Sequence, residues 1–240
     1  MKTRIDFDMV AQPDDYTCGA TCLHSVYRYY GDRIDLDDVI NDVEHLDEGG
    51  TLGVFLGSHA LRRGYKVSLY SYNLQVFDPT WHALAQEELA NRLVKQMAVK
   101  AQRKLKIASK AYVEFIELGG QIRFTELSPK LLRRHLNGNV PMIAGLSSTY
   151  LYQTAREYGP RGDYDDIRGV PGGHFVVLTG YDSDVREVRI ADPYQSNPLA
   201  KGRRFYDVGI NRLICSILLG ILTYDANVLV ISRARNRAAD

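Results

Sequence analysis

Apolar side chains recur at helical spacing in the first quarter of the chain. Over residues 18–30 they fall three or four positions apart, and two aspartates just before this run are candidate N-caps. The pattern predicts a helix that begins at Cys18. Two shorter helices are predicted at residues 36–45 and 54–63, next to glycines that end or flank them.

The strongest helical pattern covers residues 81–111, where an apolar residue recurs at every fourth position from Leu89 to Leu105. We expect one long amphipathic helix, basic over residues 84–110, within a helical insertion at about residues 78–125. Seven cations fall on its polar side: Arg92, Lys95, Lys100, Arg103, Lys104, Lys106 and Lys110. They suggest an acidic peptide or protein as partner, although a solvated helix face is the commoner origin of such a run.

Short apolar runs bounded by turn residues predict strands. Residues 66–72, 140–146 and 227–232 have this character. A hairpin is expected from residues 174–181 and 185–192, which flank a turn of three polar residues. These paired strands are the second informative part of the sequence, after the helix at Cys18.

The order of the elements predicts an α+β protein with one domain over residues 1–240. Residues 195–240 are interpreted as a C-terminal extension. Residues 156–173 contain five glycines and two prolines, which predicts a long loop that acts as a lid next to His174.

Composition and charge narrow the functional classes. Hydrophobic residues make up 45% and charged residues 25% of the chain, as in ordinary folded proteins, and the formal net charge is +1. No overall charge therefore attracts nucleic acid or an anionic membrane. The start shows no secretory signal, and the longest apolar run, residues 213–222, is too short to span a bilayer. We expect a cytoplasmic protein without nucleic-acid or membrane partners.

The chain has three cysteines, an odd number that suits reduced thiols better than disulfides. Cys18 lies at the start of the predicted helix, where the helix N-terminus favours the nucleophilic thiolate. Cys22 and Cys215 lie among apolar residues and are predicted to be buried core thiols. A metal site of Cys18, Cys22 and His24 would have irregular spacing, so we expect neither a metal nor another cofactor.

The predicted hairpin suggests a base for the thiol. With a three-residue turn, the register places His174 directly opposite Asp192 and puts both on one face with Val176 and Ile190. A carboxylate beside an imidazole fixes the ring and its tautomer, as a general base requires. A pair at a strand end without a catalytic role explains the same pattern equally well.

Further residues near the cysteine and the histidine complete a candidate site. The Gln12 amide can face a developing oxyanion together with the Cys18 N–H, and Gly19 allows a substrate to approach the sulfur. Gly173, next to His174, is a second candidate for substrate contact. Cys18 and His174 are 156 positions apart, close to the spacing of papain-type enzymes.

Three motifs together resemble the C39-like branch of the papain-like cysteine peptidases: Gln12…Thr17-Cys18-Gly19-Ala20-Thr21-Cys22-Leu23, Gly173-His174-Phe175-Val176-Val177-Leu178-Thr179-Gly180-Tyr181 and Ile190-Ala191-Asp192-Pro193. At motif level the resemblance covers residues 10–72 and about 127–195. It implies a papain-like fold, with an N-terminal catalytic helix packed on an antiparallel sheet. It also implies Cys18 as nucleophile, His174 as general base, Asp192 as its orienting partner and Gln12 in the oxyanion hole.

The resemblance leaves several reactions open. Many family members carry an acidic residue where this chain has Thr17, and the best-known ones are fused to exporters, whereas here we expect a stand-alone form. The expected reaction is cleavage of a peptide or isopeptide bond of a peptide or protein through a Cys18 thioester. Acyl transfer to an amine and a catalytically silent peptide-binding module are the alternatives. The scissile bond and the oligomeric state are left open.

Overall fold

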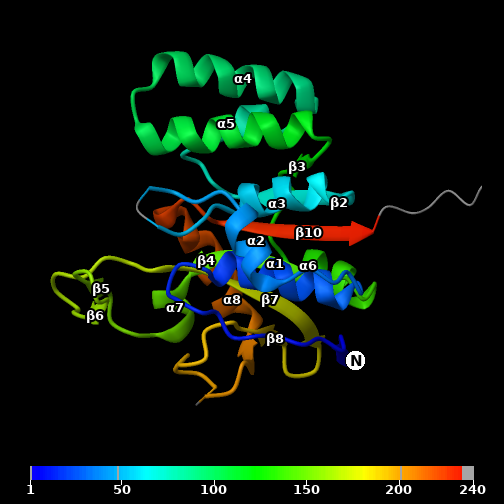
Figure 1. The fold of residues 1–240 in the computed structure, drawn as a ribbon, viewed down its shortest axis with the longest axis vertical. Helices are drawn as coiled ribbons and strands as arrows, with labels where there is room; N and C mark the ends of the chain where they lie inside the picture. The colour runs from blue at the N-terminus through cyan, green and yellow to red at the C-terminus, as the bar shows by residue number, and fades with distance from the viewer. Residues whose placement is uncertain (1, 48, 201, 234–240) are drawn as a thin grey trace, which may run out of the picture.

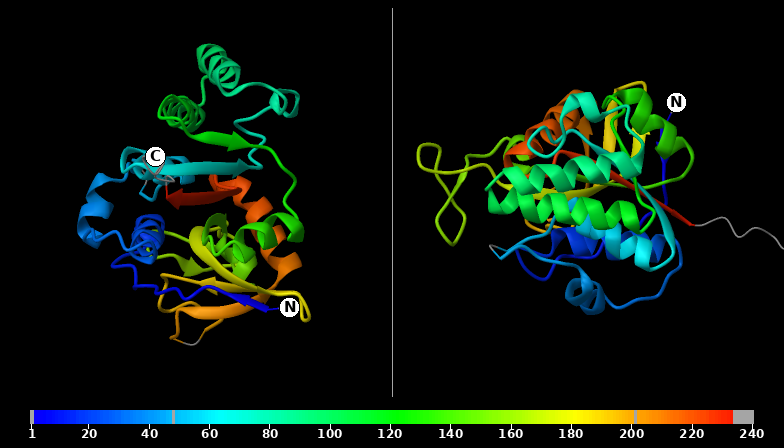
Figure 2. Two further views of the ribbon diagram at one scale, coloured as in Figure 1. Left: turned by 90° about the vertical axis from the view of Figure 1, so that its right-hand side faces the viewer. Right: turned by 90° about the horizontal axis from the view of Figure 1, so that it is seen from above.

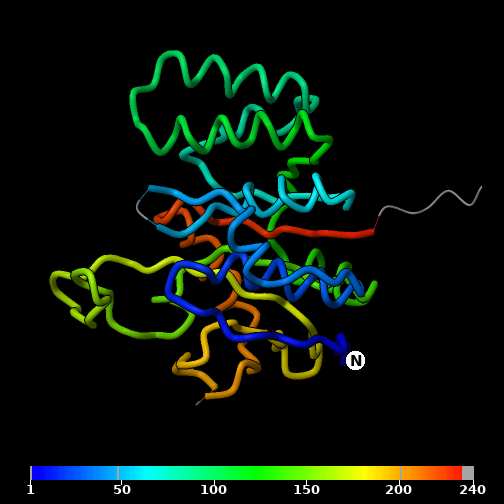
Figure 3. The backbone as a smooth tube through the Cα atoms, in the orientation of Figure 1, coloured from blue at the N-terminus to red at the C-terminus, as the bar shows by residue number. Residues whose placement is uncertain are grey.

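A mixed β-sheet runs through the centre of the molecule, which the computed structural model describes over residues 2–47, 49–200 and 202–233 (Figures 1 and 3). Its strands are β1 (Lys2–Arg4), β2 (Tyr65–Ser71), β3 (Gln121–Arg123), β4 (Met142–Ser147), β7 (Gly173–Asp182), β8 (Glu187–Ala191), β9 (Phe205–Gly209) and β10 (Asn227–Arg233). Across the described residues the order is β3-β2-β10-β4-β7-β8-β9, with β1 on β7. β2 and β3 run parallel, and the other described pairs run antiparallel. The last strand in sequence therefore lies inside the sheet.

Helices cover both faces of this sheet (Figures 1 and 2). They are α1 (Cys18–Tyr29), α2 (Leu36–Asp42), α3 (Gly53–Arg62), α4 (Gln86–Val99), α5 (Arg103–Glu117), α6 (Pro129–Asn137), α7 (Ser148–Tyr152) and α8 (Ile210–Leu219), with the 3-10 turns η1 (Pro79–Trp81) and η2 (Gly220–Thr223). Buried residues of α1, α3 and α5 form one apolar core with the sheet, and those of α6, α7 and α8 form a second core on its other face. Within the described residues, no helix has both the length and the apolarity needed to cross a membrane.

Most predicted elements occur where the pattern indicates. The helices predicted at residues 36–45 and 54–63 correspond to α2 and α3, and the strands predicted at residues 66–72 and 140–146 correspond to β2 and β4. Their ends differ from the prediction by a few residues, as is usual for element boundaries. The local hydrophobic pattern therefore suffices to place these parts of the chain.

The first helix begins at Cys18, as predicted, and packs on β7. Its residues are buried continuously from Cys18 to Tyr27, so burial stabilises the helix although its N-cap residue makes no side-chain cap hydrogen bond. Gly19 permits the close packing, because a Cβ there would lie 2.6 Å from Thr51 Cγ2 and 3.2 Å from the Phe175 ring. The start of α1 is thus fixed against the strand that carries His174.

The prediction of one long helix over residues 81–111 is wrong. Two helices, α4 and α5, form a hairpin on top of α3 (Figure 1). Between them Lys100 and Gln102 have ψ angles of 135° and 118°, which end the helical path. Leu89 and Leu93 are fully buried in the core that α4 shares with α5, whereas one straight helix would leave much of this apolar stripe in water. The basic residues are divided between the two helices and the link that contains Lys100, and an acidic partner for them stays a prediction.

The predicted hairpin forms from β7 and β8, but its predicted register is wrong. The turn holds four residues, and a bulge at Thr179 adds one residue to β7, so that Val177 lies opposite Ala191. His174 is consequently not the direct partner of Asp192, which lies beyond the end of β8. The two deviations together shift the pairing by two positions, an even number, so His174 and Asp192 keep the same face.

The segment predicted as a loop, residues 156–173, contains a small hairpin of β5 (Glu157–Tyr158) and β6 (Asp163–Tyr164). This segment projects to one side of the body (Figure 1). We call residues 156–173 the arm. Arg156 donates to the Asp166 carbonyl at 2.5 Å, and the Arg168 guanidinium lies 4.3 Å from the centre of the Tyr158 ring. These contacts explain why a glycine-rich and charged segment has a defined path.

The region predicted as a C-terminal extension supplies β9, α8 and β10, as far as it is described; residues 234–240 lie outside the described residues. The prediction that Cys215 is a buried core thiol is wrong, because α8 is amphipathic. It buries Leu213 and Ile217 and leaves Cys215 exposed. The boundaries of the predicted insertion and extension stay predictions.

Candidate active site

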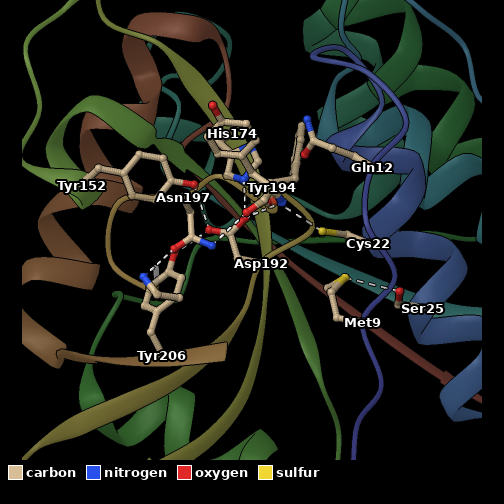
Figure 4. A network of polar contacts seen from close by, with 12 residues as sticks. Met9, Gln12, Cys22, Ser25, Tyr152, His174, Asp192, Tyr194, Asn197 and Tyr206 are labelled. Atoms are coloured by element: carbon tan, nitrogen blue, oxygen red, sulfur yellow. Dashed lines mark hydrogen bonds and ion pairs between the residues drawn. The ribbon is translucent and has the colours of Figure 1, made fainter. Parts of the chain in front are cut away.

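Three segments that are distant in sequence bring Cys18, His174 and Asp192 together. Cys18 is the first residue of α1, His174 is the second residue of β7, and Asp192 follows the last residue of β8. They are 9%, 7% and 0% exposed, respectively. Figure 4 shows the imidazole of His174 joined to the carboxylate of Asp192. The fold thus places a thiol, an imidazole and a carboxylate in one buried site.

His174 connects the carboxylate to the thiol. Its Nε2 lies 2.9 Å from Asp192 Oδ1, and since an ionised carboxylate only accepts, Nε2 donates this hydrogen bond. Nδ1 is therefore the nitrogen left for Cys18, which lies close enough for its charge to raise the pKa of His174. This is the order of a nucleophile, its general base and the group that orients the base.

The charges of this site stabilise one another. Burial alone would lower the pKa of His174, but the charges of Asp192 and Cys18 and the hydrogen bonds to both raise it to about 10. Burial alone would raise the pKa of Asp192, but the charge of His174 and the hydrogen bonds that the carboxylate accepts hold it below its ordinary value. At neutral pH the site therefore holds an imidazolium beside a carboxylate.

Two tyrosines complete the surroundings of Asp192 (Figure 4). Oδ2 accepts hydrogen bonds from the hydroxyls of Tyr152 at 2.8 Å and Tyr206 at 2.6 Å, and Oδ1 also accepts the Tyr194 N–H at 2.9 Å. With His174 this makes four donors, which fix the carboxylate in one orientation. Neither tyrosine could be predicted from the sequence, because no spacing or alternation relates α7 and β9 to Asp192.

Gln12 lies in the segment before α1 and is tied to the neighbourhood of Asp192. Its backbone N–H donates to the Pro193 carbonyl at 3.0 Å, and its side-chain Nε2 donates to the Asp14 carbonyl at 2.7 Å. An amide nitrogen carries two hydrogens, so one remains for a ligand. The place of Gln12 in an oxyanion hole stays a prediction.

The two glycines predicted to contact substrate lie in different surroundings. Gly19 is buried, and the side chains of Thr51, Leu56 and Phe175 fill the space beside its Cα. Gly173 is exposed directly before His174. Substrate contact at either glycine stays a prediction.

Cys22 differs from Cys18 although both lie on α1. It is fully buried, as predicted, and its Sγ lies 3.3 Å from the Phe175 carbonyl oxygen. Burial, together with the nearby charges of Cys18 and Asp192, raises the pKa of the Cys22 thiol well above its ordinary value. A thiol of this kind is a poor nucleophile at neutral pH, which leaves Cys18 as the reactive candidate.

The sequence matches the family model described as Peptidase_C39 like family over residues 4–208. The chain belongs to this C39-like family. The matched region includes Gln12, Cys18, His174 and Asp192 and ends before α8 and β10. Family membership confirms the resemblance seen in the motifs, and it assigns the C39-like protein to a family of peptidases. No curated protein sequence matches it significantly.

Solved structures similar to the C39-like protein have low sequence identity to it. A double glycine motif protease from an AMS/PCAT transporter, in complex with a leader peptide, is 14% identical with a TM-score of 0.47, and the alignment covers 97% of this chain and 95% of that one. A C39-like peptidase from Bacillus anthracis is 14% identical with a TM-score of 0.49, covering 98% and 100%. Xylellain, a cysteine protease from Xylella fastidiosa, is 14% identical with a TM-score of 0.44, covering 98% and 86%.

The predicted fold class is confirmed. The C39-like protein has a papain-like α+β arrangement, in which a helix that begins with Cys18 packs on a largely antiparallel sheet. The sheet carries His174 and leads directly into Asp192.

Proposed function

We propose that the C39-like protein is a cysteine peptidase or amidase that cleaves a peptide or isopeptide bond through a thioester on Cys18. One observation carries the proposal: His174 is buried, is hydrogen bonded to Asp192 at 2.9 Å, and lies close enough to Cys18 for the charge of that residue to raise the pKa of the imidazole. A module that only binds peptides gains nothing from an imidazole oriented by a buried carboxylate with four donors. The arrangement serves proton transfer.

The reaction starts from the Cys18 thiolate paired with the His174 imidazolium. The sulfur attacks the amide carbonyl carbon, so that a C–S bond forms and the oxygen becomes an oxyanion. His174 then gives its proton to the amide nitrogen, the C–N bond breaks and the amine leaves. Neutral His174 next takes a proton from water, whose oxygen attacks the thioester and releases the acid and the thiolate. Asp192 holds the ring in place throughout.

The oxyanion needs donors that are already oriented. The backbone N–H of Cys18, in the first turn of α1, is one candidate, and the second Nε2 hydrogen of Gln12 is the other. The hydrogen bond from Gln12 to the Asp14 carbonyl restrains the amide before a substrate arrives. This restraint lowers the entropy cost of forming the hole.

The test uses a peptide library made from a digested proteome, with mass spectrometry of the new chain ends. We expect the wild type and the Cys215→Ala variant to cut the same bonds, because Cys215 is an exposed thiol on α8, whereas Cys18, His174 and Asp192 are buried. Cys18→Ala and His174→Ala should lower the cleavage rate at least about a thousandfold, as removal of a nucleophile or its base does in other hydrolases.

Two controls separate the alternatives. An added amine acceptor distinguishes hydrolysis from acyl transfer, since only transfer gives a product joined to the amine. Alkylation of Cys18 by iodoacetamide tests the silent module. If wild type cuts nothing, and its alkylation rate follows the same pH profile as that of His174→Ala, the proposed peptidase is wrong.

A further inference from the structure

A second buried carboxylate lies near His174 and lacks the donors that surround Asp192. Asp225, just before β10, is 5% exposed, and its Oδ1 has no hydrogen-bond partner among the described residues. Its Oδ2 lies 3.1 Å from the Thr223 hydroxyl, which is also 3.1 Å from the Gly220 carbonyl oxygen. One hydroxyl hydrogen cannot serve both acceptors fully. Asp225 therefore has at most one shared donor.

Asn227, two positions further on, adds two more polar atoms without partners. It is 1% exposed, and neither Oδ1 nor Nδ2 has a hydrogen-bond partner among the described residues. Glycines make room for its amide, because a Cβ on Gly53 or Gly145 would lie 2.5 Å or 3.1 Å from Oδ1. Buried polar atoms are nearly always hydrogen bonded, so three orphan atoms in one place mark a position where a water or a ligand group would supply the partners. We call Thr223, Asp225 and Asn227 the Asp225 cluster.

The Asp225 cluster adjoins the catalytic residues through the sheet. Strand β4 lies between β7 and β10, and its Gly145 pairs with Phe175 on one side and with Asn227 on the other. At Gly173, the exposed residue before His174, a Cβ would lie 2.7 Å from Thr223 Oγ1 and 3.2 Å from Asp225 Oδ2. The missing side chain at Gly173 thus leaves these two polar groups just beneath the surface beside His174.

The buried carboxyl group of Asp225 favours a cation, although the charged groups that act on it, Lys104 and His174, are themselves cationic. Burial raises the pKa of Asp225 to about 7, and Thr223, Lys104 and His174 oppose this effect only in part. The Lys104 ammonium lies 5.1 Å from the centre of the Tyr224 ring. Glu157 lies on the arm. Burial, followed by the charge of Asp15, raises the pKa of Glu157, whereas the charge of His174 lowers it. Glu157 is therefore a second carboxylate within electrostatic reach of His174.

We propose that the Asp225 cluster is a subsite for a cationic side chain, lysine or arginine, of the peptide substrate close to the scissile bond. An ammonium or guanidinium group supplies donors to Asp225 Oδ1 and Asn227 Oδ1 and offsets the buried negative charge. That the ligand is a substrate rests on the proposed peptidase function, whereas binding of the cation needs no turnover. The two ideas can therefore be tested apart.

The binding test uses the inactive Cys18→Ala protein and ligand-observed NMR. N-acetylargininamide is compared with N-acetylcitrullinamide, which has nearly the same shape without the charge. At pH 8 we expect the arginine compound to bind about tenfold more tightly, in line with a charged hydrogen bond. The difference should vanish when Asp225→Asn is added and persist with Asp37→Asn, a change at an exposed residue of α2. Equal binding of the two compounds, or no binding of either, overturns the subsite.

The cleavage test compares wild type with Asp225→Asn on the peptide library. Wild-type sites should be enriched in lysine or arginine at one fixed position, and the variant should still cut while losing about tenfold of that preference. Cleavage without any cationic preference would overturn the subsite and leave the peptidase intact. Charge-dependent binding of the arginine compound without cleavage of any peptide would overturn the peptidase and leave the subsite intact. Thermal unfolding of Asp225→Asn confirms that the variant is folded.

Discussion

Two buried aspartates show how donors decide the effect of a carboxylate on stability. The charge of His174 and the hydrogen bonds from His174, Tyr206 and Tyr194 hold the pKa of Asp192 low. Asp192 therefore contributes stability above its unfolded pKa, and this contribution is lost as pH falls through the folded value. The contribution of Asp225 to stability has the opposite dependence on pH. Its folded pKa of about 7 exceeds its ordinary 3.8, so its contribution is present at acid pH and is lost as pH rises from about 4 through 7.

Asp225→Asn should therefore change the pH dependence of stability. We expect urea unfolding to show that wild type loses stability relative to the variant between pH 4 and 8. The difference should be a few kcal/mol, since each pKa unit corresponds to about 1.4 kcal/mol. At pH 8 the variant should be the more stable protein, because the uncompensated charge is gone. Asp37→Asn should follow wild type, and a variant with the wild-type pH dependence would contradict the burial argument.

Tyr206→Phe tests the orientation of Asp192. The change removes the 2.6 Å hydrogen bond to Oδ2 and leaves the bond from Tyr152. We expect kcat to fall about tenfold with little change in KM, as for loss of one hydrogen bond to a charged group. Because this bond lowers the pKa of Asp192, the acid limb of the kcat–pH profile should move to higher pH. Tyr72→Phe removes a hydrogen bond to the Thr125 carbonyl and is the control; an equal fall in kcat there would refute a specific role.

At the scale of elements, local pattern predicted what local contacts determine. The helix at Cys18 and the hairpin with His174 follow from spacing and alternation. The predicted register was wrong, but it still placed Asp192 on the same face as His174, because side chains on a strand return to the same face every two residues. Tyr152 and Asp225 come from other elements and meet the site only after the sheet forms. The only sequence signal for Asp225 and Asn227 was that these polar residues lie just before and at the start of the otherwise apolar strand β10.

The α4–α5 hairpin offers an element-scale test of burial. Leu93 is fully buried, whereas its neighbour Val94 is 50% exposed. We expect Leu93→Ala to lower the free energy of unfolding by about 2–5 kcal/mol, measured by urea denaturation. Val94→Ala should change it by no more than about 0.5 kcal/mol. Similar values for both would argue that the hairpin does not pack as described.

At the scale of the whole molecule, the arm is a candidate for substrate contact outside the buried site. It exposes Tyr164 and Ile167, which are 60% and 80% accessible, and its Glu157 senses the charge of His174. Glu157 also forms a β-bridge with Val170. Replacing residues 158–169 by Asn-Gly would therefore connect these two residues through a two-residue hairpin turn and shorten the arm. For a peptide that the wild type cleaves, we expect the shortened variant to have a several-fold higher KM and an unchanged melting temperature. An unchanged KM would rule out a lid.

The position of β10 has a consequence for biosynthesis. β2 and β4 are joined only through this strand, which leaves the ribosome after all the others described. Pairing of such distant segments must wait until residues 227–233 emerge. Asp225 and Asn227 arrive with them, so the Asp225 cluster is completed late. On the proposed peptidase function, a nascent chain that already contains Cys18 and His174 therefore still lacks the Asp225 cluster.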